Sequence, residues 1–400
     1  MKFSRRLAIT AALTGLPVLA SGAFAARPKA KAKDPVPTGS PGETPLGPLD
    51  TAAKWAFVQD FTTGAVLLDK RADEQMPPSS MTKLMTMYLV YEQLKKGNMK
   101  LTDTLPVSAR AAAMGGSRMF LDVNKTAVVE DLIRGVIVQS GNDAAVVLAE
   151  AVGGSEERFA DMMNAKAKQL GLTRSVFRNA TGWPNPEQVM SARDIATLAW
   201  HIITEFPEYY KYDSEKTFKY NNIEQPNRHP MVQAGTADGL KTGHTDAGGY
   251  GLAASSSREG GRRLIMVLNG LKSMHDRAKE AERVMNWAFA NFENVTLFSA
   301  NEVVDNAPVW LGVDKTVPLV GGRDLVVTLP RSWRQTASIR ISYEAPIKAP
   351  IAKGDPVGTL LLRGQGVPNM DVKLLAGNAV PRLSLPMRGL AVLTHYVSGG

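Results

Sequence analysis

The 400-residue chain contains no cysteine. This absence excludes disulfide bonds, cysteine-ligated metal sites and a cysteine nucleophile. Histidine is scarce, with five residues, and no two of them have the i, i+4 spacing of a helical zinc site. The net charge is +9, but no basic stripe interleaved with aromatic residues is present, so a nucleic-acid partner is not predicted. The modest basic excess instead suits an anionic surface, such as phospholipid headgroups or an acidic polymer.

Long apolar runs are absent beyond the N-terminus, and no other segment is apolar enough to span a bilayer. Residues 1–25 open with a basic stretch, continue with an apolar stretch and end in the small-residue pattern AFA. This order is typical of a secretory signal peptide that is cleaved after Ala25, and it predicts export. Glycine and proline interruptions disfavour an uncleaved anchor, and the pair Arg5-Arg6 leaves the Sec and twin-arginine routes open.

Residues 26–47 are rich in Pro, Lys and Gly and have almost no apolar side chains, which predicts a disordered linker. Residues 54–70 alternate in the manner of two strands around Thr63-Gly64, which predicts a β-hairpin. Helical periodicity then predicts helices over 77–94, 126–139, 143–153, 155–170, 191–204 and 276–292.

After about Val295 helical periodicity gives way to short β-like runs separated by Gly, Pro and Asp. This change predicts an all-β domain over 296–382. In the tail, 383–400, four apolar residues share one helical face. The tail is too short to cross a bilayer, and its pattern fits an interfacial amphipathic anchor, a frayed terminus or a further strand.

The stretch "PPSSMTKLMT" places Ser80 one helical turn before Lys83, directly after a helix-starting pair of prolines. Residues i and i+3 share a helix face, so the amine can reach the hydroxyl. A lysine can activate a serine nucleophile only when burial or a neighbouring positive charge keeps the amine neutral. Taken alone, the pattern equally fits an N-cap serine and a surface lysine.

Two further stretches carry the same kind of chemistry. "VQSGNDAAVV" sets Ser140 and Asn142 between two apolar helical segments, although a second Ser-x-Asn occurs at Ser299. "DGLKTGHTDAGGYGLAAS" supplies Lys241, Thr242 and Gly243 ahead of a glycine-rich turn. A cation and a hydroxyl can bind a terminal carboxylate, and a glycine admits close approach of a ligand backbone. The alternative for this stretch is a solvated hairpin end.

The three stretches follow the order of the motifs of serine β-lactamases and penicillin-binding proteins. The sequence resembles the low-molecular-mass penicillin-binding proteins, the serine-type D-alanyl-D-alanine carboxypeptidases. The resemblance spans roughly residues 48–382 and includes "SSMTK", "GGSRMFL", "SGNDAA", "ATGWPNPEQVMSARDIA" and "KTGHTDAGGYGLAAS". It implies an α+β fold, with a β-lactamase/transpeptidase-like catalytic domain over 48–295, an antiparallel sheet flanked by helices, and then the small all-β C-terminal domain.

The resemblance also implies roles in acyl transfer. Ser80 attacks the penultimate D-alanine carbonyl, and Lys83 is its general base. Ser140 relays a proton to the leaving D-alanine nitrogen, and Asn142 orients Lys83 and the substrate amide.

Substrate binding is implied by the same resemblance. Lys241 and Thr242 hold the terminal carboxylate, and the backbone N–H groups of the nucleophile and of His244 form the oxyanion hole. Two arginines, Arg228 in "PNRHP" and Arg277 in "HDRAKEAE", match further carboxylate-binding positions. No metal or organic cofactor is implied.

The function implied is a periplasmic D,D-carboxypeptidase that acts on peptidoglycan stem pentapeptides, is acylated by β-lactams and contacts the inner membrane peripherally. A D,D-endopeptidase, a weak β-lactamase and a non-catalytic wall-binding protein are the alternatives. An efficient β-lactamase is disfavoured because Glu187 is the only acid in the relevant loop and no asparagine lies four residues beyond it.

Overall fold

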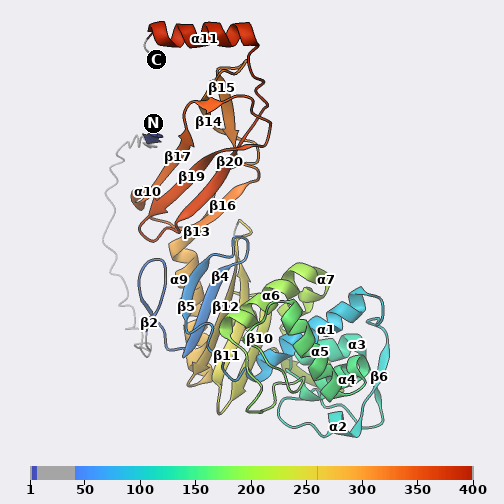
Figure 1. The fold of residues 1–400 in the computed structure, drawn as a ribbon. Helices are drawn as coiled ribbons and strands as arrows, with labels where there is room; N and C mark the ends of the chain where they lie inside the picture. The colour runs from blue at the N-terminus through green and yellow to red at the C-terminus, as the bar shows by residue number, and fades with distance from the viewer. Residues whose placement is uncertain (1, 7–40, 259, 399–400) are drawn as a thin grey trace, which may run out of the picture. The chain divides into compact units, whose positions relative to one another are not determined.

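A computed structural model of the chain describes residues 2–6, 41–258 and 260–398. They form two compact units (Figure 1). The larger unit ends at Asn291, and the smaller unit begins at Phe292 and also takes in residues 2–6. Most of the predicted signal peptide and linker lies outside the described residues, so the signal peptide stays a prediction.

The larger unit is built on a five-stranded antiparallel sheet with the order β10-β11-β12-β4-β5. The central strands β11 and β12 are buried over long consecutive runs, which requires cover on both faces of the sheet. Figure 1 shows α9 along one side of the sheet and α6 on the other. The strands of this unit are β2 (Pro41–Gly42), β3 (Leu49–Asp50), β4 (Trp55–Asp60), β5 (Val66–Lys70), β6 (Thr104–Pro106), β7 (Thr126–Val128), β8 (Thr217–Tyr220), β9 (Ile223–Pro226), β10 (Gly239–Thr245), β11 (Gly249–Ser257) and β12 (Arg263–Leu271).

Helix α1 is the centre of the helical half of this unit. Residues 83–91 are all buried, because α4, α5 and α6 surround the helix. The helices are η1 (Ser79–Thr82), α1 (Lys83–Lys95), α2 (Ala109–Ala112), α3 (Val129–Ile137), α4 (Asn142–Gly153), α5 (Glu156–Gln169), α6 (Ala192–Glu205), α7 (Pro207–Tyr210), η2 (Lys211–Ser214), α8 (Pro230–Gln233) and α9 (Met274–Asn291).

The predicted hairpin and the predicted helices are present with small shifts of their ends. Residues 126–128 differ, because they pair with β6 as strand β7 before α3 begins. Residues 41–47, predicted as the end of a disordered linker, are structured: β2 pairs with β3, and the backbones of Glu43 and Asp69 exchange hydrogen bonds of 2.7 and 2.9 Å. Pairing with the rest of the chain orders this Pro- and Gly-rich stretch, and local composition cannot reveal such pairing.

The smaller unit is mainly β, as predicted. Its seven-stranded sheet has the order β1-β17-β19-β20-β15-β14-β18, and β13 pairs separately with β16. Aliphatic side chains such as Leu319, Leu360 and Leu374 form its main core. Its elements are β1 (Lys2–Arg6), β13 (Phe292–Phe298), β14 (Val303–Trp310), β15 (Thr316–Val320), β16 (Leu325–Pro330), α10 (Trp333–Thr336), β17 (Ala337–Glu344), β18 (Ile347–Lys348), β19 (Pro356–Gly364), β20 (Met370–Ala376) and α11 (Leu385–Ser398).

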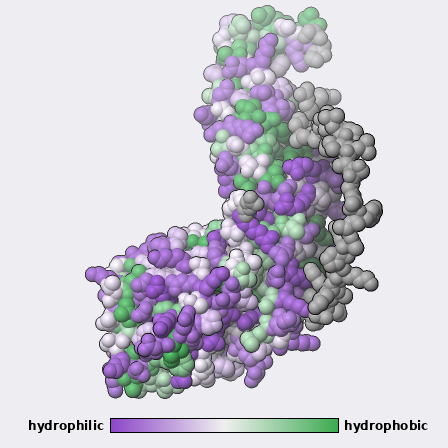
Figure 2. Space-filling model, turned by 180° about the vertical axis from the view of Figure 1, so that it is seen from behind, coloured by the Kyte–Doolittle hydropathy of each residue, from purple (hydrophilic) through white to green (hydrophobic). Residues whose placement is uncertain are grey.

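The tail is a helix, α11, which decides between the helical and strand alternatives. Five of its large apolar side chains are solvent-exposed, from 51% at Met387 to 87% at Val397. Apolar and polar residues are interspersed over α11 at the top of Figure 2. Within the described residues, no helix has both the length and the apolar character needed to cross a membrane.

Candidate active site

Ser80 and Lys83 meet at the start of the central helix. After Pro77-Pro78 the chain forms the 3-10 turn η1, and α1 begins at Lys83. Side chains three residues apart eclipse each other in a 3-10 helix, so the turn aligns the two groups more closely than an α-helix would. Lys83 Nζ lies 3.0 Å from Ser80 Oγ.

The Lys83 amine is fully buried and faces three oxygen atoms. Nζ lies 2.7 Å from Asn142 Oδ1, 2.6 Å from the Thr181 carbonyl oxygen and 3.0 Å from the Ser80 hydroxyl. A neutral amine has two N–H groups and one lone pair. Because the amide and carbonyl oxygens can only accept, the lone pair is left for the Ser80 proton. Burial, and then the positive charge of Lys241, lower the pKa of Lys83 well below its usual value, which favours this neutral form.

Ser140 and Asn142 are held at the junction of α3 and α4. Ser140 has a left-handed backbone, with φ of +60°, which a non-glycine residue adopts only when its surroundings impose it. Asn142 is the first residue of α4, and besides accepting from Lys83 it donates from Nδ2 to the Gly115 carbonyl at 2.8 Å. The Asn142 side chain therefore links Lys83 to the loop that contains Gly115, and the residues after Gly115 in that loop line the cleft.

Lys241 comes from β10, the edge strand of the sheet, and its amine lies 2.8 Å from Ser140 Oγ. Burial, and then the positive charges of Arg228 and Arg277, lower the pKa of Lys241 to about 7. The amine can therefore gain and lose a proton near neutrality, and Ser140 is the side chain that is hydrogen-bonded to it.

Gly243 is required by the protein's own backbone. A Cβ atom at this position would lie 2.9 Å from Ser79 Cβ and 3.1 Å from Ser80 N. Gly182, whose φ is +82°, also packs against this turn and would place a Cβ 1.9 Å from the Ser79 carbonyl oxygen. Both glycines therefore leave room for the turn that carries Ser80, which is a different use of Gly243 from the close ligand approach that its motif suggested.

A cleft of about 660 Å³ opens over these groups. The two lysines lie beneath its surface, while Ser80 is partly exposed. Among the residues predicted for the site, those that line the cleft are Ser80, Ser140, Asn142, Arg228, Thr242, Gly243, His244 and Arg277.

The two arginines give one end of the cleft a positive charge. Arg277 is 7% exposed, and its Nε is buried without a hydrogen-bond partner among the described residues. Its Nη2 donates to the Arg228 carbonyl at 3.5 Å. Burial lowers the pKa of both guanidinium groups, because desolvation disfavours their charged form. An anionic ligand bound beside them would offset the free-energy cost of keeping them charged.

Sequence reasoning missed several residues of the cleft, among them Thr181, Trp183 and Tyr250. Thr181 acts through its backbone carbonyl, and every residue type has one. Trp183, 46% exposed, lines the wall beside Gly116, and Tyr250 stacks on His244 with ring centroids 3.9 Å apart. Both aromatic residues stand inside stretches that carried the family resemblance, which was the available signal.

Glu187 lies outside the cleft. Its carboxylate is exposed and accepts a hydrogen bond of 2.8 Å from Arg178 Nε. Among the described residues lining the cleft, the only carboxylate is that of Asp246. The loop glutamate that activates the deacylating water in class A β-lactamases therefore has no counterpart at the position of Glu187.

Comparison with known proteins identifies the family. The D-alanyl-D-alanine carboxypeptidase family profile matches residues 42–272, and the profile of the penicillin-binding protein 5 C-terminal domain matches residues 292–382. D-alanyl-D-alanine carboxypeptidase DacC of Escherichia coli (strain K12) is 40% identical over 329 residues, covering 80% of this chain and 81% of the relative.

Solved structures agree as well. Penicillin binding protein 5 from Haemophilus influenzae superposes with a TM-score of 0.73 at 35% identity, covering 84% of this chain and all of the other. Penicillin-Binding Protein D2 from Listeria monocytogenes, in an ampicillin-bound form, has a TM-score of 0.55 at 28% identity and covers 60% of this chain and 98% of the other. These matches confirm the predicted fold, and the chain belongs to the D-alanyl-D-alanine carboxypeptidase family of serine-type hydrolases.

Proposed function

We propose that the protein is a periplasmic carboxypeptidase that removes the terminal D-alanine from peptidoglycan stem pentapeptides through an acyl-enzyme on Ser80. The observation that carries this proposal is the buried Lys83 amine, whose lone pair is directed to Ser80 Oγ by two pure acceptors. A serine needs such a base to become a useful nucleophile.

Acylation follows from this arrangement. Lys83 takes the hydroxyl proton while Ser80 Oγ forms a bond to the penultimate carbonyl carbon. The tetrahedral intermediate then collapses, the C–N bond to the terminal D-alanine breaks, and Ser140 delivers a proton to the departing nitrogen. Lys241 can replace the proton that Ser140 gives, because the two groups are hydrogen-bonded. Lys83 gives the proton it took from Ser80 to solvent and Lys241 regains one, so Lys83 is again a neutral base close to Ser80. It then takes a proton from the water that attacks the ester carbonyl, the ester C–O bond breaks, and the proton passes to Ser80 Oγ.

The negative charge that develops on the carbonyl oxygen during the attack needs hydrogen-bond donors close to that oxygen. We assign this role to the backbone N–H groups of Ser80 and His244. Gly243 supports the assignment, because its position against Ser80 N brings β10 and η1 together at the nucleophile. Preorganised donors of this kind are worth about 2.7–4 kcal/mol each in the transition state.

The substrate's terminal carboxylate fits the positive end of the cleft. Lys241 and Thr242 are both nearly buried, and Arg228 and Arg277 line the same cleft. The unpartnered Arg277 Nε supports anion binding at this end.

Acylation by β-lactams follows from the same geometry. A β-lactam offers a strained amide with a carboxylate nearby, and the related Listeria protein was crystallised in ampicillin-bound and cefotaxime-bound forms. Because Glu187 lies outside the cleft, we expect the Ser80 adduct to be released slowly, which disfavours the β-lactamase alternative.

Peripheral contact with the inner membrane is proposed for α11. Its exposed apolar side chains suit the boundary between headgroups and acyl chains, and the net positive charge of the chain favours anionic lipid. One short helix gives weak, reversible binding, so the contact is expected to depend on anionic lipid.

The test is release of D-alanine from a synthetic stem pentapeptide, with Ser80→Ala and the matched control Ser299→Ala. We expect Ser80→Ala to abolish release and Ser299→Ala, in the other Ser-x-Asn sequence, to retain it. Unchanged release by Ser80→Ala would refute the assignment. Product analysis on cross-linked muropeptides separates the carboxypeptidase from the endopeptidase, because only the latter liberates two stem peptides from a dimer.

A further inference from the structure

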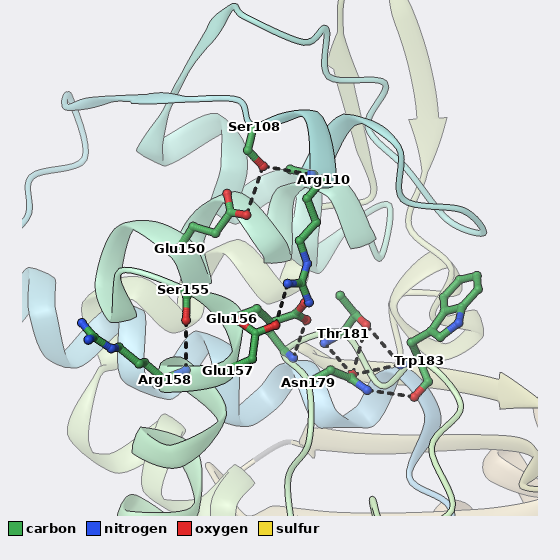
Figure 3. A network of polar contacts seen from close by, with 12 residues as sticks. Ser108, Arg110, Glu150, Ser155, Glu156, Glu157, Arg158, Asn179, Thr181 and Trp183 are labelled. Atoms are coloured by element: carbon green, nitrogen blue, oxygen red, sulfur yellow. Dashed lines mark hydrogen bonds and ion pairs between the residues drawn. The ribbon is translucent and has the colours of Figure 1, made fainter.

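The Thr181 carbonyl, which lies 2.6 Å from the Lys83 amine, belongs to a segment without regular secondary structure. No helix or strand ladder fixes the direction of this carbonyl, so other groups must do so. Residues 179–183 obtain their shape from side-chain hydrogen bonds, most of which converge on one residue, Asn179 (Figure 3).

Asn179 acts as a hub for this segment. Its Oδ1 accepts from three successive backbone N–H groups, those of Thr181 at 3.2 Å, Gly182 at 2.8 Å and Trp183 at 3.1 Å. Its Nδ2 donates to the Trp183 carbonyl at 3.0 Å. Since the N–H groups all point at Oδ1, the peptide planes between them are fixed, and the Thr181 carbonyl is directed away from Asn179 and onto Lys83.

The preceding residue is anchored independently. The Ala180 N–H donates to Glu156 Oε1 at 3.0 Å, and the Ala180 carbonyl accepts from Thr86 Oγ1 at 2.6 Å. Glu156 is itself held by Arg110 Nη2 at 2.5 Å (Figure 3). Ala180 is therefore tied through both its N–H and its carbonyl, and the Asn179 side chain holds the residues that follow it.

We propose that Asn179 is a positioning residue for the general base, and that this position requires an acceptor without charge. Three convergent N–H groups form a concavity that would bind an anionic oxygen even more strongly than an amide oxygen. An aspartate would therefore satisfy the hydrogen bonds of the segment. It would also add a negative charge beside Lys83, which stabilises the ammonium form that cannot act as a base.

Four charged groups already affect the pKa of Lys83. Lys241 on β10 and Arg228, ahead of α8, favour loss of the proton, whereas Asp143 on α4 and Glu156 on α5 oppose it. Both carboxylates are bonded elsewhere. Asp143 accepts from backbone N–H groups of the loop before β7, and Glu156 accepts from Arg110. An aspartate at position 179 would have no cationic partner of its own, because the contacts of the Asn179 side chain include no cation.

This inference rests on the proposed acylation of Ser80, so the experiment measures that step. The second-order rate constant for acylation by a fluorescent penicillin is followed from about pH 5.5 to 9.5 for the wild type, Asn179→Asp, Asn179→Ala and Asn179→Ser. The matched control is Asn185→Asp, which adds the same charge at an exposed position of the same loop, where Asn185 Oδ1 accepts from the Glu187 N–H. Circular dichroism and melting confirm that each variant is folded.

We expect Asn179→Asp to move the acid limb of the profile upward by about one unit. The ratio of its acylation rate constant to that of the wild type is then about one tenth at pH values below the limb and approaches one at pH values above it. Asn179→Ala loses roughly tenfold at every pH because the carbonyl is no longer fixed. Asn179→Ser recovers most of that loss, since its hydroxyl is an uncharged acceptor, and Asn185→Asp leaves the limb in place.

Two results would overturn the inference. One is an Asn179→Asp profile parallel to the wild type, or matched by Asn185→Asp. The other is an Asn179→Ser variant no better than Asn179→Ala, and this comparison stands even if the aspartate variant does not fold. Failure of the proposed function gives a different result, because the wild type itself would then not be acylated.

Discussion

The two units of the molecule differ in what they bury. The larger unit buries lysines, asparagines, serines and a histidine along with its apolar core, including Lys83, Lys241, Asn142 and His229. Among the described residues of the smaller unit, the only buried polar side chain is Thr328, which donates to Asn294 Oδ1 at 2.8 Å. The smaller unit is otherwise closed by aliphatic side chains on its sheet.

Buried polar groups are costly unless each is satisfied, so a fold keeps them in number only where they do something that apolar packing cannot. In the larger unit Lys83, Lys241, Ser140 and Asn142 form hydrogen-bonded pairs under the cleft. The smaller unit has no comparable system among its described residues. We therefore expect chemistry to be sensitive to substitutions in the first unit, and stability or attachment to be sensitive to those in the second.

The largest effect is expected from Lys83→Met, which keeps the volume of the side chain and removes the base proposed for Ser80. Loss of a general base typically costs about 10²–10⁴-fold in rate, so acylation by a penicillin should fall by that factor. The control is Lys373→Met, which removes an exposed lysine of the smaller unit and should change the acylation rate by less than about twofold. Stopped-flow or gel-based acylation kinetics measure both. Equal losses in the two variants would contradict the comparison.

The second prediction concerns pH. The acylation rate should rise with pH as Lys83 loses its proton, and fall again as Lys241, whose pKa is lowered to about 7, loses the charge that holds a carboxylate. Lys241→Arg keeps the charge throughout this range, so it should remove the falling limb while leaving the rising one. A falling limb that persists unchanged in Lys241→Arg would assign it to another group.

The third prediction concerns stability of the smaller unit. Leu360 is completely buried in its core, so Leu360→Ala should lower the free energy of unfolding of this unit by about 2–5 kcal/mol. Chemical denaturation followed by circular dichroism measures the change. Acylation by the folded protein at room temperature should stay within about twofold of the wild type, because the substitution touches no group of the cleft. A tenfold loss of acylation would show that the units are functionally coupled.

The smallest effect on chemistry is expected in α11. Leu390→Glu with Leu393→Glu places charges on its exposed apolar side chains. Sedimentation with vesicles of phosphatidylglycerol and phosphatidylethanolamine should show loss of binding, while the rate of acylation in solution is unchanged. The control pair is Ser384→Glu with Thr394→Glu, which adds the same two negative charges at exposed polar positions without removing apolar area. Greater loss in the control pair than in the leucine pair would indicate purely electrostatic attraction.

The fold could be predicted well from the sequence where one period extends over many residues. Helices α5, α6 and α9 and the hairpin of β4 and β5 lie close to their predicted ranges, because amphipathic spacing reports burial directly. The pairing of residues 41–47 could not be predicted, since it depends on strand β5 and on no property of the local sequence.

The candidate site likewise contains features that the sequence predicts and features that it does not. Side chains proposed to act by their own chemistry, such as Ser80, Lys83 and Lys241, could be predicted as candidates from motif spacing and order. The Thr181 carbonyl, the positive φ of Ser140 and the contact of Gly243 with the nucleophile's turn are properties of the backbone. No residue type specifies these, because they arise only when distant segments pack together.

The central claim, that Ser80 is a nucleophile activated by a neutral Lys83, is tested most directly by intact-protein mass spectrometry after addition of a penicillin. The account predicts one drug equivalent added to the wild type, persisting for minutes or longer, and no addition to Ser80→Ala. An adduct that forms equally on Ser80→Ala, or the absence of any adduct on the folded wild type, would contradict it.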